Sequence, residues 1–522
     1  MTPSPSPSLS REASLVDPAQ KATPSPQQVD LEKAATATET KVPPRPIFPV
    51  SDIDQGIIGW EGQDDPNNPQ NFAPSRKWTL LVLISLVSLI SPLGSTVFSP
   101  ALTDLAEDFG ETDRTLLSFT VSIYLIGYVL GPLVFAPLSE IYGRRIVMSG
   151  ANWFFVVWQI GCALAPNIAS LTVMRFLAGC GGSACLTIGA GVIADLFPVH
   201  QRGVATSLWS LGPLLGPNIG PIAGGFIGQN LGWRWVFWIL LIIGGALCLG
   251  MECFNRETYA AVLIRWKTEK MKKELGRTDL RSAYDLQGNG VSALRVLKLG
   301  MKRPLILLFK SPIIPFLTTY VALIYGLLYL FFTTIPMVFE GQYDFSPGIA
   351  GLAYLGIGIG FLLGLYISAV TSDRILLKLA ARNGGKHEPE MRLTQLLFWA
   401  CILPVSFFWY GWSVEKRTHW IVPIIGMAPF GIGCIGVWMP IQIYAIDCYP
   451  AYAASANAAM TAARSLVGAL LPLAGPQMFE TLGYGWGNSL LGFLALAFVP
   501  FAFLLQHFGK RLRERFKVDL EN

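Results

Sequence analysis

Charged residues are scarce in this chain of 522 residues, of which Asp, Glu, Lys and Arg make up 14%. Typical soluble domains carry about 25%. A soluble protein of this length needs a charged shell that the composition does not supply, while hydrophobic residues reach 52%. The shortage of charge excludes an ordinary soluble globular protein and favours one that lies in a membrane.

Several motifs with defined chemistry are absent as well. No GxxxxGK[ST] phosphate loop occurs, which excludes ATP bound in such a loop as an energy source. CxxC, HExxH and GxSxG are also missing, so we expect no metal, no cofactor and no enzymatic activity. The eight Cys lie in or at the ends of apolar runs and indicate packing residues, without a disulfide framework. The net charge of +5 gives no reason to infer a nucleic-acid partner.

Long apolar runs recur from Trp78 to Phe508, and each can cross a hydrocarbon layer of about 30 Å as a helix. Helices are expected because lipid offers backbone amides no partner, and the strands of a barrel would read as short alternating segments. The prediction is an all-α polytopic membrane protein with twelve transmembrane helices. They are expected at residues 78–99, 116–138, 146–166, 170–195, 203–228, 234–253, 312–336, 347–371, 391–412, 420–446, 455–479 and 484–507.

Lys and Arg indicate how these helices are oriented, because such residues concentrate on the cytosolic side. With a cytosolic N-terminus, 33 of the 39 basic residues fall on the cytosolic face. The opposite face receives only Arg114, Arg234, Lys416 and Arg417. We therefore expect a multi-pass protein of the cell membrane with both termini in the cytosol; the vacuolar membrane is the alternative.

Three segments outside the helices have their own character. Residues 1–77 are rich in Pro, Ser and Thr, and we expect a disordered cytosolic tail. Residues 254–311 form a basic cytosolic loop, in which Leu263–Leu275 predicts an amphipathic helix on anionic lipid headgroups. Residues 508–522 are expected to form a basic cytosolic tail.

Short sequence echoes indicate that the chain is a duplication. Three of them occur in the same order at equivalent places of the two halves, residues 78–253 and 312–507. They pair Gly131 and Ser139–Glu140 with Gly364 and Ser372–Asp373, Asp195–Pro198 with Asp447–Pro450, and Leu231–Trp235 with Leu482–Trp486. Two pseudo-symmetric six-helix bundles about a midplane cavity are a transporter architecture.

Several segments carry longer motifs: GPLVFAPLSEIYGRR (Gly131–Arg145), LTVMRFLAGCGG (Leu171–Gly182), GPLLGPNIGPIAGG (Gly212–Gly225) and YAASANAAMTAARSLVGALLPL (Tyr452–Leu473). Together they resemble the major facilitator superfamily, in particular its fungal drug:proton antiporters with twelve spans. Glu140 stands where the first motif usually has Asp, and Ala136 where many members have Gly. The resemblance implies the major facilitator fold and transport by alternating access.

The first motif, which begins at Gly131, predicts a charge network at the cytosolic end of the second span. Arg144 and Arg145 follow a turn at Gly143, and Glu140 lies close enough in sequence to pair with them. The resemblance implies that this network biases alternating access. The alternative is topological, with both Arg residues simply holding the loop in the cytosol.

Two Arg residues lie inside apolar spans, where a charge is costly and needs a partner or water. We expect Arg175 to be a cation beside the cavity that tunes proton binding or meets an anionic group; the alternative is snorkelling to the nearby interface. Arg464 is deeper and is expected to serve the second half in the same way. No acid lies in mid-span, so proton coupling must use Asp195 or Glu140 with an Arg partner, or a proton carried by the substrate.

The fifth span combines glycines at four-residue spacing with prolines, a pattern that predicts a tight, bent packing seam. Its residues are Gly212, Gly216, Pro217, Gly220, Pro221, Gly224 and Gly225. The resemblance implies that this seam seals the cavity in exporters; packing alone is the alternative.

A cavity wall with many aromatics and few charges suits bulky, amphipathic molecules. The candidates are Asn218, Tyr320, Tyr325, Trp438, Gln442 and Tyr444. Aromatic residues are also ordinary at lipid-facing positions, which is the alternative for each.

From these features and the resemblance we expect a monomeric, proton-driven efflux carrier in a fungal plasma membrane, whose partners are a small-molecule substrate, protons and membrane lipid. It would export drugs or a toxic metabolite of its own cell. One alternative is an importer or facilitator of a nutrient such as a polyamine or an organic acid. Another is a membrane sensor that transports nothing and signals through its tail and central loop.

Overall fold

The computed structural model describes residues 48–522 except 285–292, 312, 385–387, 450–452 and 516–522. All twelve predicted spans fall on helix, with boundaries shifted by several residues. In the described part of the chain, ten helical stretches are long and apolar enough to cross a membrane. One of them, Ser455–Arg513, holds the last two predicted spans. The protein is therefore an all-α polytopic membrane protein, as predicted.

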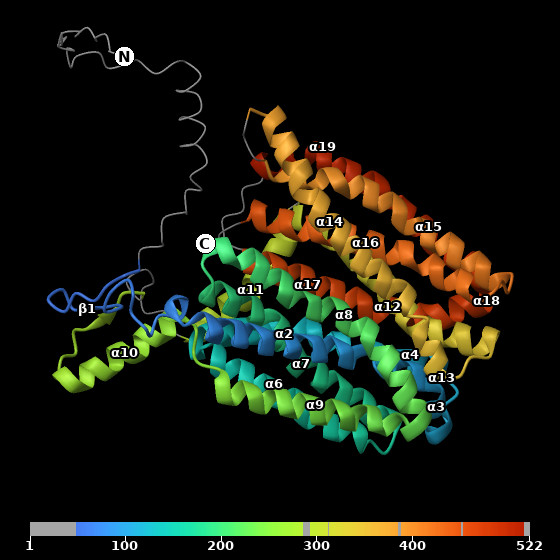
Figure 1. The fold of residues 1–522 in the computed structure, drawn as a ribbon, viewed down its shortest axis with the longest axis horizontal. Coiled ribbons are helices and arrows are strands. Elements are labelled where there is room, and N and C mark those ends of the chain that lie inside the picture. Colours follow the sequence, from blue (N-terminus) through green and yellow to red (C-terminus); the bar gives the residue numbers. More distant parts are fainter. Residues whose placement is uncertain (1–47, 285–292, 312, 385–387, 450–452, 516–522) are drawn as a thin grey trace, which may run out of the picture. The chain divides into compact units, whose positions relative to one another are not determined.

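The helices form two consecutive sets (Figure 1). The N-terminal half contains α2 (Pro74–Thr96), η2 (Ser99–Ala101), α3 (Leu102–Phe109), α4 (Arg114–Ser122), α5 (Tyr124–Tyr142), α6 (Arg144–Ala163), α7 (Ile168–Leu196), α8 (Val199–Leu231) and α9 (Trp233–Phe254). The C-terminal half contains α12 (Ile313–Tyr343), α13 (Pro347–Leu352), α14 (Leu355–Arg382), η4 (Pro389–Gln395), α15 (Leu396–Glu415), α16 (Ile421–Cys448), α17 (Ala453–Leu470), η6 (Leu471–Ala474), α18 (Gly475–Ala497) and α19 (Val499–Arg515).

The packing of the two halves repeats, as the sequence echoes predict. In the N-terminal half, α2 packs on α8, α5 on α7, and α6 on both α7 and α9. The equivalent C-terminal pairs are α12 on α17, α14 on α16, and α15 on both α16 and α18. The halves meet through α5 with α17 and α8 with α13, which are also equivalent pairs.

Glycines with positive φ make three of the turns between spans. Gly143 (φ 100°) separates α5 from α6, and Gly232 (φ 88°) separates α8 from α9. Gly483 (φ 73°) lies inside α18, so the first part of that helix completes the eleventh span and the rest begins the twelfth. Each turn uses the left-handed region that glycine enters at no steric cost.

Residues 48–77 are folded, which corrects the prediction that all of 1–77 is disordered; residues 1–47 lie outside the described part. β1 (Ile57–Ile58) pairs in parallel with β2 (Arg281–Ser282), and η1 (Pro69–Asn71) follows before α2. Trp60 is 2% exposed and packs with Ile58, Leu280 and Ile264 of α10 (Ala260–Leu275). This small core could not be predicted from the sequence, because its apolar residues come from two segments that are far apart in the chain.

The central segment contains more structure than a loop. α10 covers the predicted amphipathic stretch, but Ile264 on its buried face packs against the segment that contains Trp60. α11 (Ala293–Lys310) lies against α5 and α17, one helix from each half. The C-terminal helix α19 runs to Arg515, so residues 508–515 are helical where a tail was expected. Residues 516–522 lie outside the described part.

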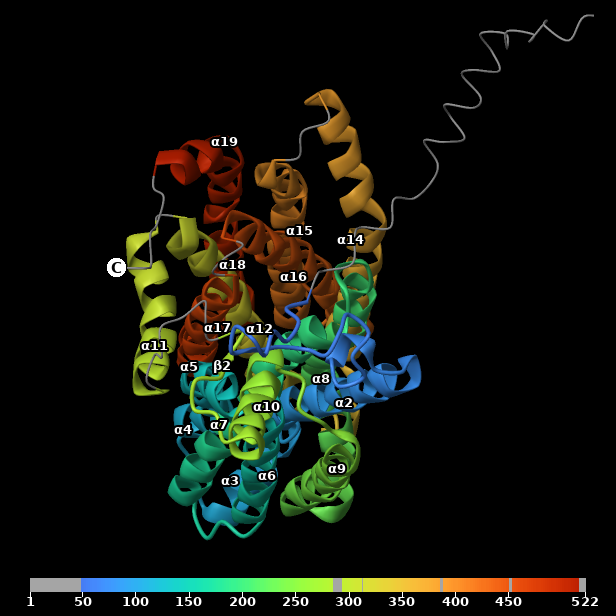
Figure 2. The ribbon, with the colours of Figure 1, turned by 90° about the vertical axis from the view of Figure 1, so that its left-hand side faces the viewer.

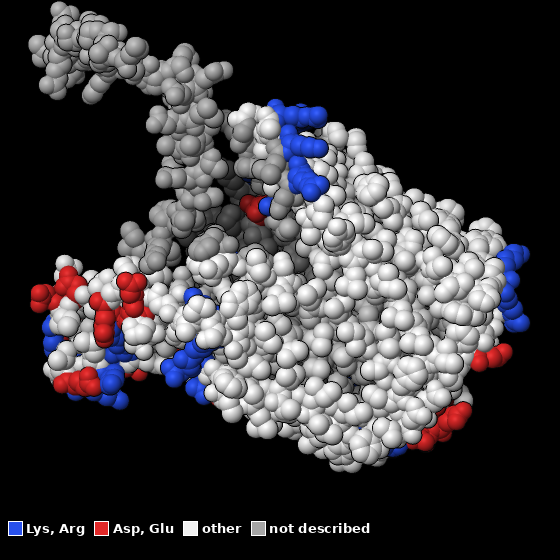
Figure 3. Space-filling view, viewed as in Figure 1, with Lys and Arg blue, Asp and Glu red and all other residues white. Residues whose placement is uncertain are grey.

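Charged side chains gather at the two ends of the bundles, and the face between them is almost uncharged (Figure 3). We call the end with Arg144, Arg392 and Arg513 the basic end, and the opposite end the Glu340 end. Figure 2 views the molecule from the basic end, with the C-terminal half above the N-terminal half and α11 beside both. This distribution of charge suits a protein that spans a membrane with its ends in water.

Candidate functional site

The carboxylate of Glu257, just after α9, caps the start of α6 at the basic end. Its oxygens accept hydrogen bonds from the backbone amides of Arg144 (2.9 Å) and Arg145 (3.1 Å). The first amides of a helix have no partner within it, and its positive dipole end favours an anion. Gly143 permits this approach, since a Cβ there would overlap the Glu257 carboxylate. The cap ties the sixth span to the third.

The side chain of Arg144 joins three further elements. Its Nε lies 3.4 Å from Oδ2 of Asp195 in α7, and its Nη1 donates to Ser139 Oγ of α5 at 2.5 Å. Its guanidinium carbon lies 4.6 Å from the ring centre of Tyr259, whose phenol pKa is raised by burial. We call Ser139, Gly143, Arg144, Asp195 and Glu257 the Arg144 cluster. The structure thus brings together three predicted residues, Gly143, Arg144 and Asp195.

Glu140 has a different position from the predicted one. Its side chain is exposed, and within the described residues it forms no ion pair with Arg144 or Arg145. The pairing rule for residues four apart requires one continuous helix, but α5 ends at Tyr142 and α6 begins after the Gly143 turn. Asp195 takes the place expected for Glu140, and Arg145 contributes its backbone amide.

The C-terminal half has a cluster of charged residues at the equivalent place, but with more ion pairs. Arg392, at the start of the ninth span, lies 3.0 Å from Asp447 at the end of α16. Two more ion pairs lie just before α15. Arg513 Nε lies 3.0 Å from Glu390 Oε1, and Lys510 Nζ lies 2.5 Å from Glu388 Oε1. The Lys510 ammonium lowers the pKa of Glu388. In the C-terminal half, the basic residues Lys510 and Arg513 therefore join the twelfth span to the ninth. In the N-terminal half, the acidic residue Glu257 joins the sixth span to the third.

Arg175 is buried, 1% exposed, which corrects the alternative of snorkelling to the interface. Its guanidinium donates to four carbonyl oxygens: Thr120 (2.7 Å), Ser95 (2.8 Å), Val121 (3.2 Å) and Gly94 (3.4 Å). Its Cζ also lies 4.3 Å from the ring centre of Phe98. These carbonyls belong to the last turns of α2 and α4, so Arg175 joins two helix ends and neither lines the cavity nor reaches the interface.

The predicted glycine seam lies between α8 and α2. A Cβ on Gly216 would lie 2.6 Å from the carbonyl oxygen of Leu89, and one on Gly220 would lie 2.8 Å from that of Leu93. Gly212 faces Ser85 and Gly224 faces Val97 in the same way. The contacting residues are therefore spaced four apart along both helices. Gly131 makes a similar close contact with Ser183 between α5 and α7.

The prolines of α8 add polar contacts to this seam. Pro221 has no amide hydrogen, which leaves the Pro217 carbonyl without its helical partner. The hydroxyl of Thr96 donates to that carbonyl at 2.9 Å. Gly225 instead faces Pro347 of the other half, so the motif both joins α8 to α2 and contributes to the contact between halves.

In the part of the chain that the structure describes, polar contacts join the two halves on one side only. Between α2–α9 and α12–α18, every hydrogen bond and ion pair in the described part lies toward the Glu340 end. They are Ser95–Tyr329 (2.8 Å), Ser99–Phe332 (2.6 Å), Thr103–Glu340 (2.9 Å), Gln229–Gly348 (3.0 Å) and Arg114–Glu480 (3.6 Å). At the basic end, Figure 3 shows a hollow between the halves.

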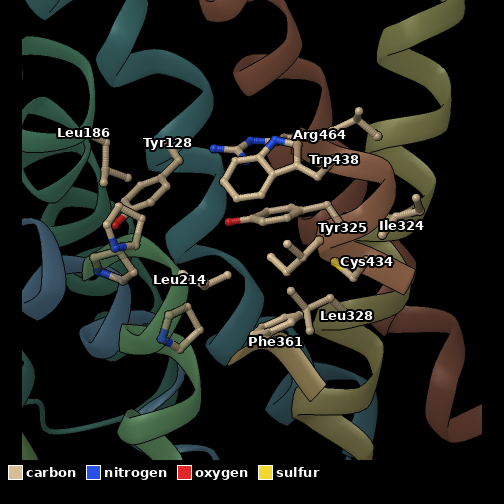
Figure 4. Close-up of a pocket in the computed structure, with 15 residues that line it drawn as sticks. Tyr128, Leu186, Leu214, Ile324, Tyr325, Leu328, Phe361, Cys434, Trp438 and Arg464 are labelled. Carbon is tan, nitrogen blue, oxygen red and sulfur yellow. The ribbon is translucent and has the colours of Figure 1, made fainter. Parts of the chain in front are cut away.

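A cavity lies between the halves, lined by residues of both (Figure 4). Its wall is mostly apolar: Pro92, Tyr128, Leu186, Pro213, Leu214, Pro217, Val321, Ile324, Tyr325, Leu328, Phe361, Cys434, Ile435, Trp438 and Arg464. Arg464 is the charged residue among them. Such a wall suits an amphipathic small molecule.

Of the predicted cavity residues, only Tyr325 and Trp438 line this cavity. Tyr320 stacks on Phe498 within the C-terminal half, with ring centres 5.5 Å apart. Tyr444 lies near Glu390 at the basic end, Gln442 donates to Asn457, and Asn218 is buried beside Gly358. Sequence alone does not say which side of a helix faces the other half.

The sequence analysis did not predict a role for Glu340, whose carboxylate lies in α12 at the end opposite the basic end. Its Oε2 accepts a hydrogen bond from Thr103, and its Oε1 is buried without a partner in the described part. The seventh span was predicted to end at Pro336, whereas α12 continues to Tyr343. The apolar run past Pro336 was the signal for this longer helix.

This fold and cavity define a membrane transporter, and the sequence comparisons identify its family. The model of the Major Facilitator Superfamily matches residues 84–472, so the chain belongs to that superfamily. It is similar to the MFS-type transporter penM of Penicillium rubens, 49% identical over 88% of this chain and 90% of that protein. The efflux pump radE of Floropilus chiversii is 42% identical over 90% and 87% of the two chains.

Solved structures show the same fold at low sequence identity. A crystal structure of a D-xylose-proton symporter aligns with a TM-score of 0.61 at 18% identity, over 81% of this chain and 98% of that one. A partially occluded, inward-open structure of the xylose transporter XylE from E. coli gives a TM-score of 0.60 at 19% identity, over 83% and 98%. The relatives named above are transporters, and this chain is a transporter and not an enzyme.

Proposed function

We propose that this transporter exports bulky amphipathic small molecules, such as drugs or a toxic metabolite, by proton antiport. The observation that carries the proposal is the cavity between the halves, where the described residues form polar contacts between the halves on its Glu340 side alone. A site shared by two bundles and closed on one side is what alternating access requires. That a relative 42% identical is named an efflux pump favours the outward direction.

The distribution of Lys and Arg orients the molecule in this proposal. The basic end lies in the cytosol, as do both termini, in the plasma membrane of a fungal cell. The structure then corresponds to an inward-facing state, in which the cavity receives substrate from the cytosol. Export requires the contacts at the Glu340 end to open and the halves to close at the basic end.

Protons drive this cycle in our proposal through carboxylates that change partners. Asp195 pairs with Arg144 at the cytosolic side, and the half-buried Glu340 accepts a hydrogen bond from Thr103 at the outer contact. Protonation of Asp195 removes the charge that holds Arg144, whereas protonation of Glu340 neutralises a carboxylate whose Oε1 has no partner in the described part and so favours the closed outer contact. Because Glu340 and Asp195 lie on opposite sides of the cavity, each can respond to the pH of one compartment.

Dye export by cells tests this proposal. Cells that lack their own pumps are loaded with a fluorescent hydrophobic dye, with and without the protein at measured surface level. Lower steady-state accumulation that an uncoupler reverses is expected. Equal accumulation contradicts transport of such molecules, and higher accumulation indicates import.

A further inference from the structure

Arg464 places a positive charge in the cavity wall without a matching negative one. Its guanidinium carbon lies 4.9 Å from the ring centre of Tyr325 and 5.0 Å from that of Trp438. Figure 4 shows the three side chains together at the cavity. The aromatic faces stabilise the cation and hold it in place.

The hydrogen-bonding capacity of Arg464 is not used up. Its Nε is buried without a hydrogen-bond partner in the described part of the chain. No Asp or Glu is among the residues that line the cavity, and no ion pair of Arg464 occurs among the described residues. Arg175 is different, because four carbonyl oxygens surround its guanidinium. The half-buried guanidinium of Arg464 lines the cavity and has unused donors, so a ligand in the cavity can accept hydrogen bonds from it.

We infer that Arg464 binds an anionic group of the transported molecule, so that the substrates are amphipathic organic anions. This inference rests on the proposed function and narrows its substrate class. A guanidinium presents two parallel donors that match a carboxylate. The anion would pair with Arg464 beside Tyr325 and Trp438.

The rest of the cavity fits the apolar body of such a molecule. Pro213, Leu214 and Pro217 form one wall, contributed by α8 of the N-terminal half. Leu328 and Phe361 lie on the other side, from α12 and α14. A ligand held between these walls and Arg464 touches both halves, as a substrate of alternating access must.

Arg464 could instead serve only to pack Tyr325 against Trp438. The two roles differ in what they do to ligands of different charge. A packing role changes the cavity for every ligand alike, whereas an anion site affects only ligands that carry a negative group. A pair of probes that differ in one charge separates them.

The test measures equilibrium binding to the full-length protein in lipid nanodiscs by fluorescence polarisation. The probes are a fluorescent amphipathic carboxylate and its uncharged primary amide. The wild type is expected to bind the carboxylate about tenfold more tightly or better, as a charge-assisted hydrogen bond provides. Arg464→Gln should remove this preference and leave amide binding within about twofold. Arg464→Lys should retain part of it.

Lys416→Gln is the matched control, because Lys416 is an exposed cation outside the cavity. Equal losses for both probes in Arg464→Gln, or no preference in the wild type, would overturn the assignment. Thermal unfolding of each variant shows that it is folded. The proposed function is judged separately by transport of the same probes in proteoliposomes: binding preference without transport refutes export and leaves the anion site standing.

Discussion

The Nε atom of Arg144 lies 3.4 Å from Oδ2 of Asp195, joining the start of α6 to the end of α7 at the basic end. Arg392 and Asp447 repeat this contact in the C-terminal half at 3.0 Å. Both pairs lie within one half, so each joins helices of a single bundle. Among the described residues, the polar contacts between bundles lie elsewhere, toward Glu340.

Neutralising Asp195 should reduce transport far more than neutralising Glu140. Asp195→Asn removes the charge that pairs with Arg144, and we expect about a tenfold loss of transport rate, in line with the value of a charge-assisted hydrogen bond. Glu140→Gln changes an exposed side chain and should cost less than about twofold. Dye export at matched surface level measures both. Equal losses in the two variants would show that Glu140 belongs to the network after all.

Glu257 should matter for stability as well as transport. Glu257→Ala removes the charged acceptor of the first two amides of α6, whose hydrogen bonds are partly buried, which costs roughly 1–3 kcal/mol. We expect a lower unfolding temperature in detergent, with Glu257→Gln in between because its amide oxygen still accepts. Glu269→Ala in α10 is the control, since Glu269 is exposed. An unchanged unfolding temperature in Glu257→Ala would contradict the capping role.

The glycine seam gives a prediction about bulk. A Cβ on Gly224 would overlap the carbonyl oxygen of Val97, whereas one on Gly150 would have no atom within 4 Å. Gly224→Ala must push α8 away from α2, at a cost of about 1–3 kcal/mol or more. We expect reduced yield of folded protein for Gly224→Ala and a normal yield for Gly150→Ala, measured by size-exclusion chromatography. Equal yields would contradict the close packing of α8 against α2 at Gly224.

Glu340 should control how the outer contact opens. Glu340→Gln removes a charge whose Oε1 has no hydrogen-bond partner in the described part, and so stabilises the closed contact. We expect a several-fold slower transport rate with unchanged ligand binding. Glu480→Gln, at the same end but exposed, should have little effect, because exposed ion pairs are worth about 0–1 kcal/mol. Single-turnover efflux and nanodisc binding together measure the difference. Weaker binding with normal turnover would contradict a role in opening.

Much of the fold was predictable because it depends on local patterns. Apolar runs give the spans, since lipid leaves the backbone no other partner than its own helix. The spacing of Gly212, Gly216, Gly220 and Gly224 predicted a seam, because residues four apart share one helix face. The echoes between the halves predicted equivalent packing, and the same helix pairs are in contact in both.

The site was less predictable because it depends on which helix faces which. Glu140 is closer in sequence to Arg144 than Asp195 is, yet the turn at Gly143 redirects the chain and α7 brings Asp195 alongside. Tyr320 and Tyr325 lie on the same helix, and only the second faces the cavity. The fold around Trp60 joins residues more than 200 positions apart, which no local pattern records.

Proton-coupled export is tested most directly in inside-out vesicles that contain the purified protein. An amphipathic dye is added outside, and a pH gradient with an acidic lumen is imposed. Dye should accumulate in the lumen while the lumen becomes more alkaline, and neither change should follow dye addition once an ionophore has removed the gradient beforehand. Dye movement that is indifferent to the pH gradient, or no dye movement, would contradict proton antiport by this transporter.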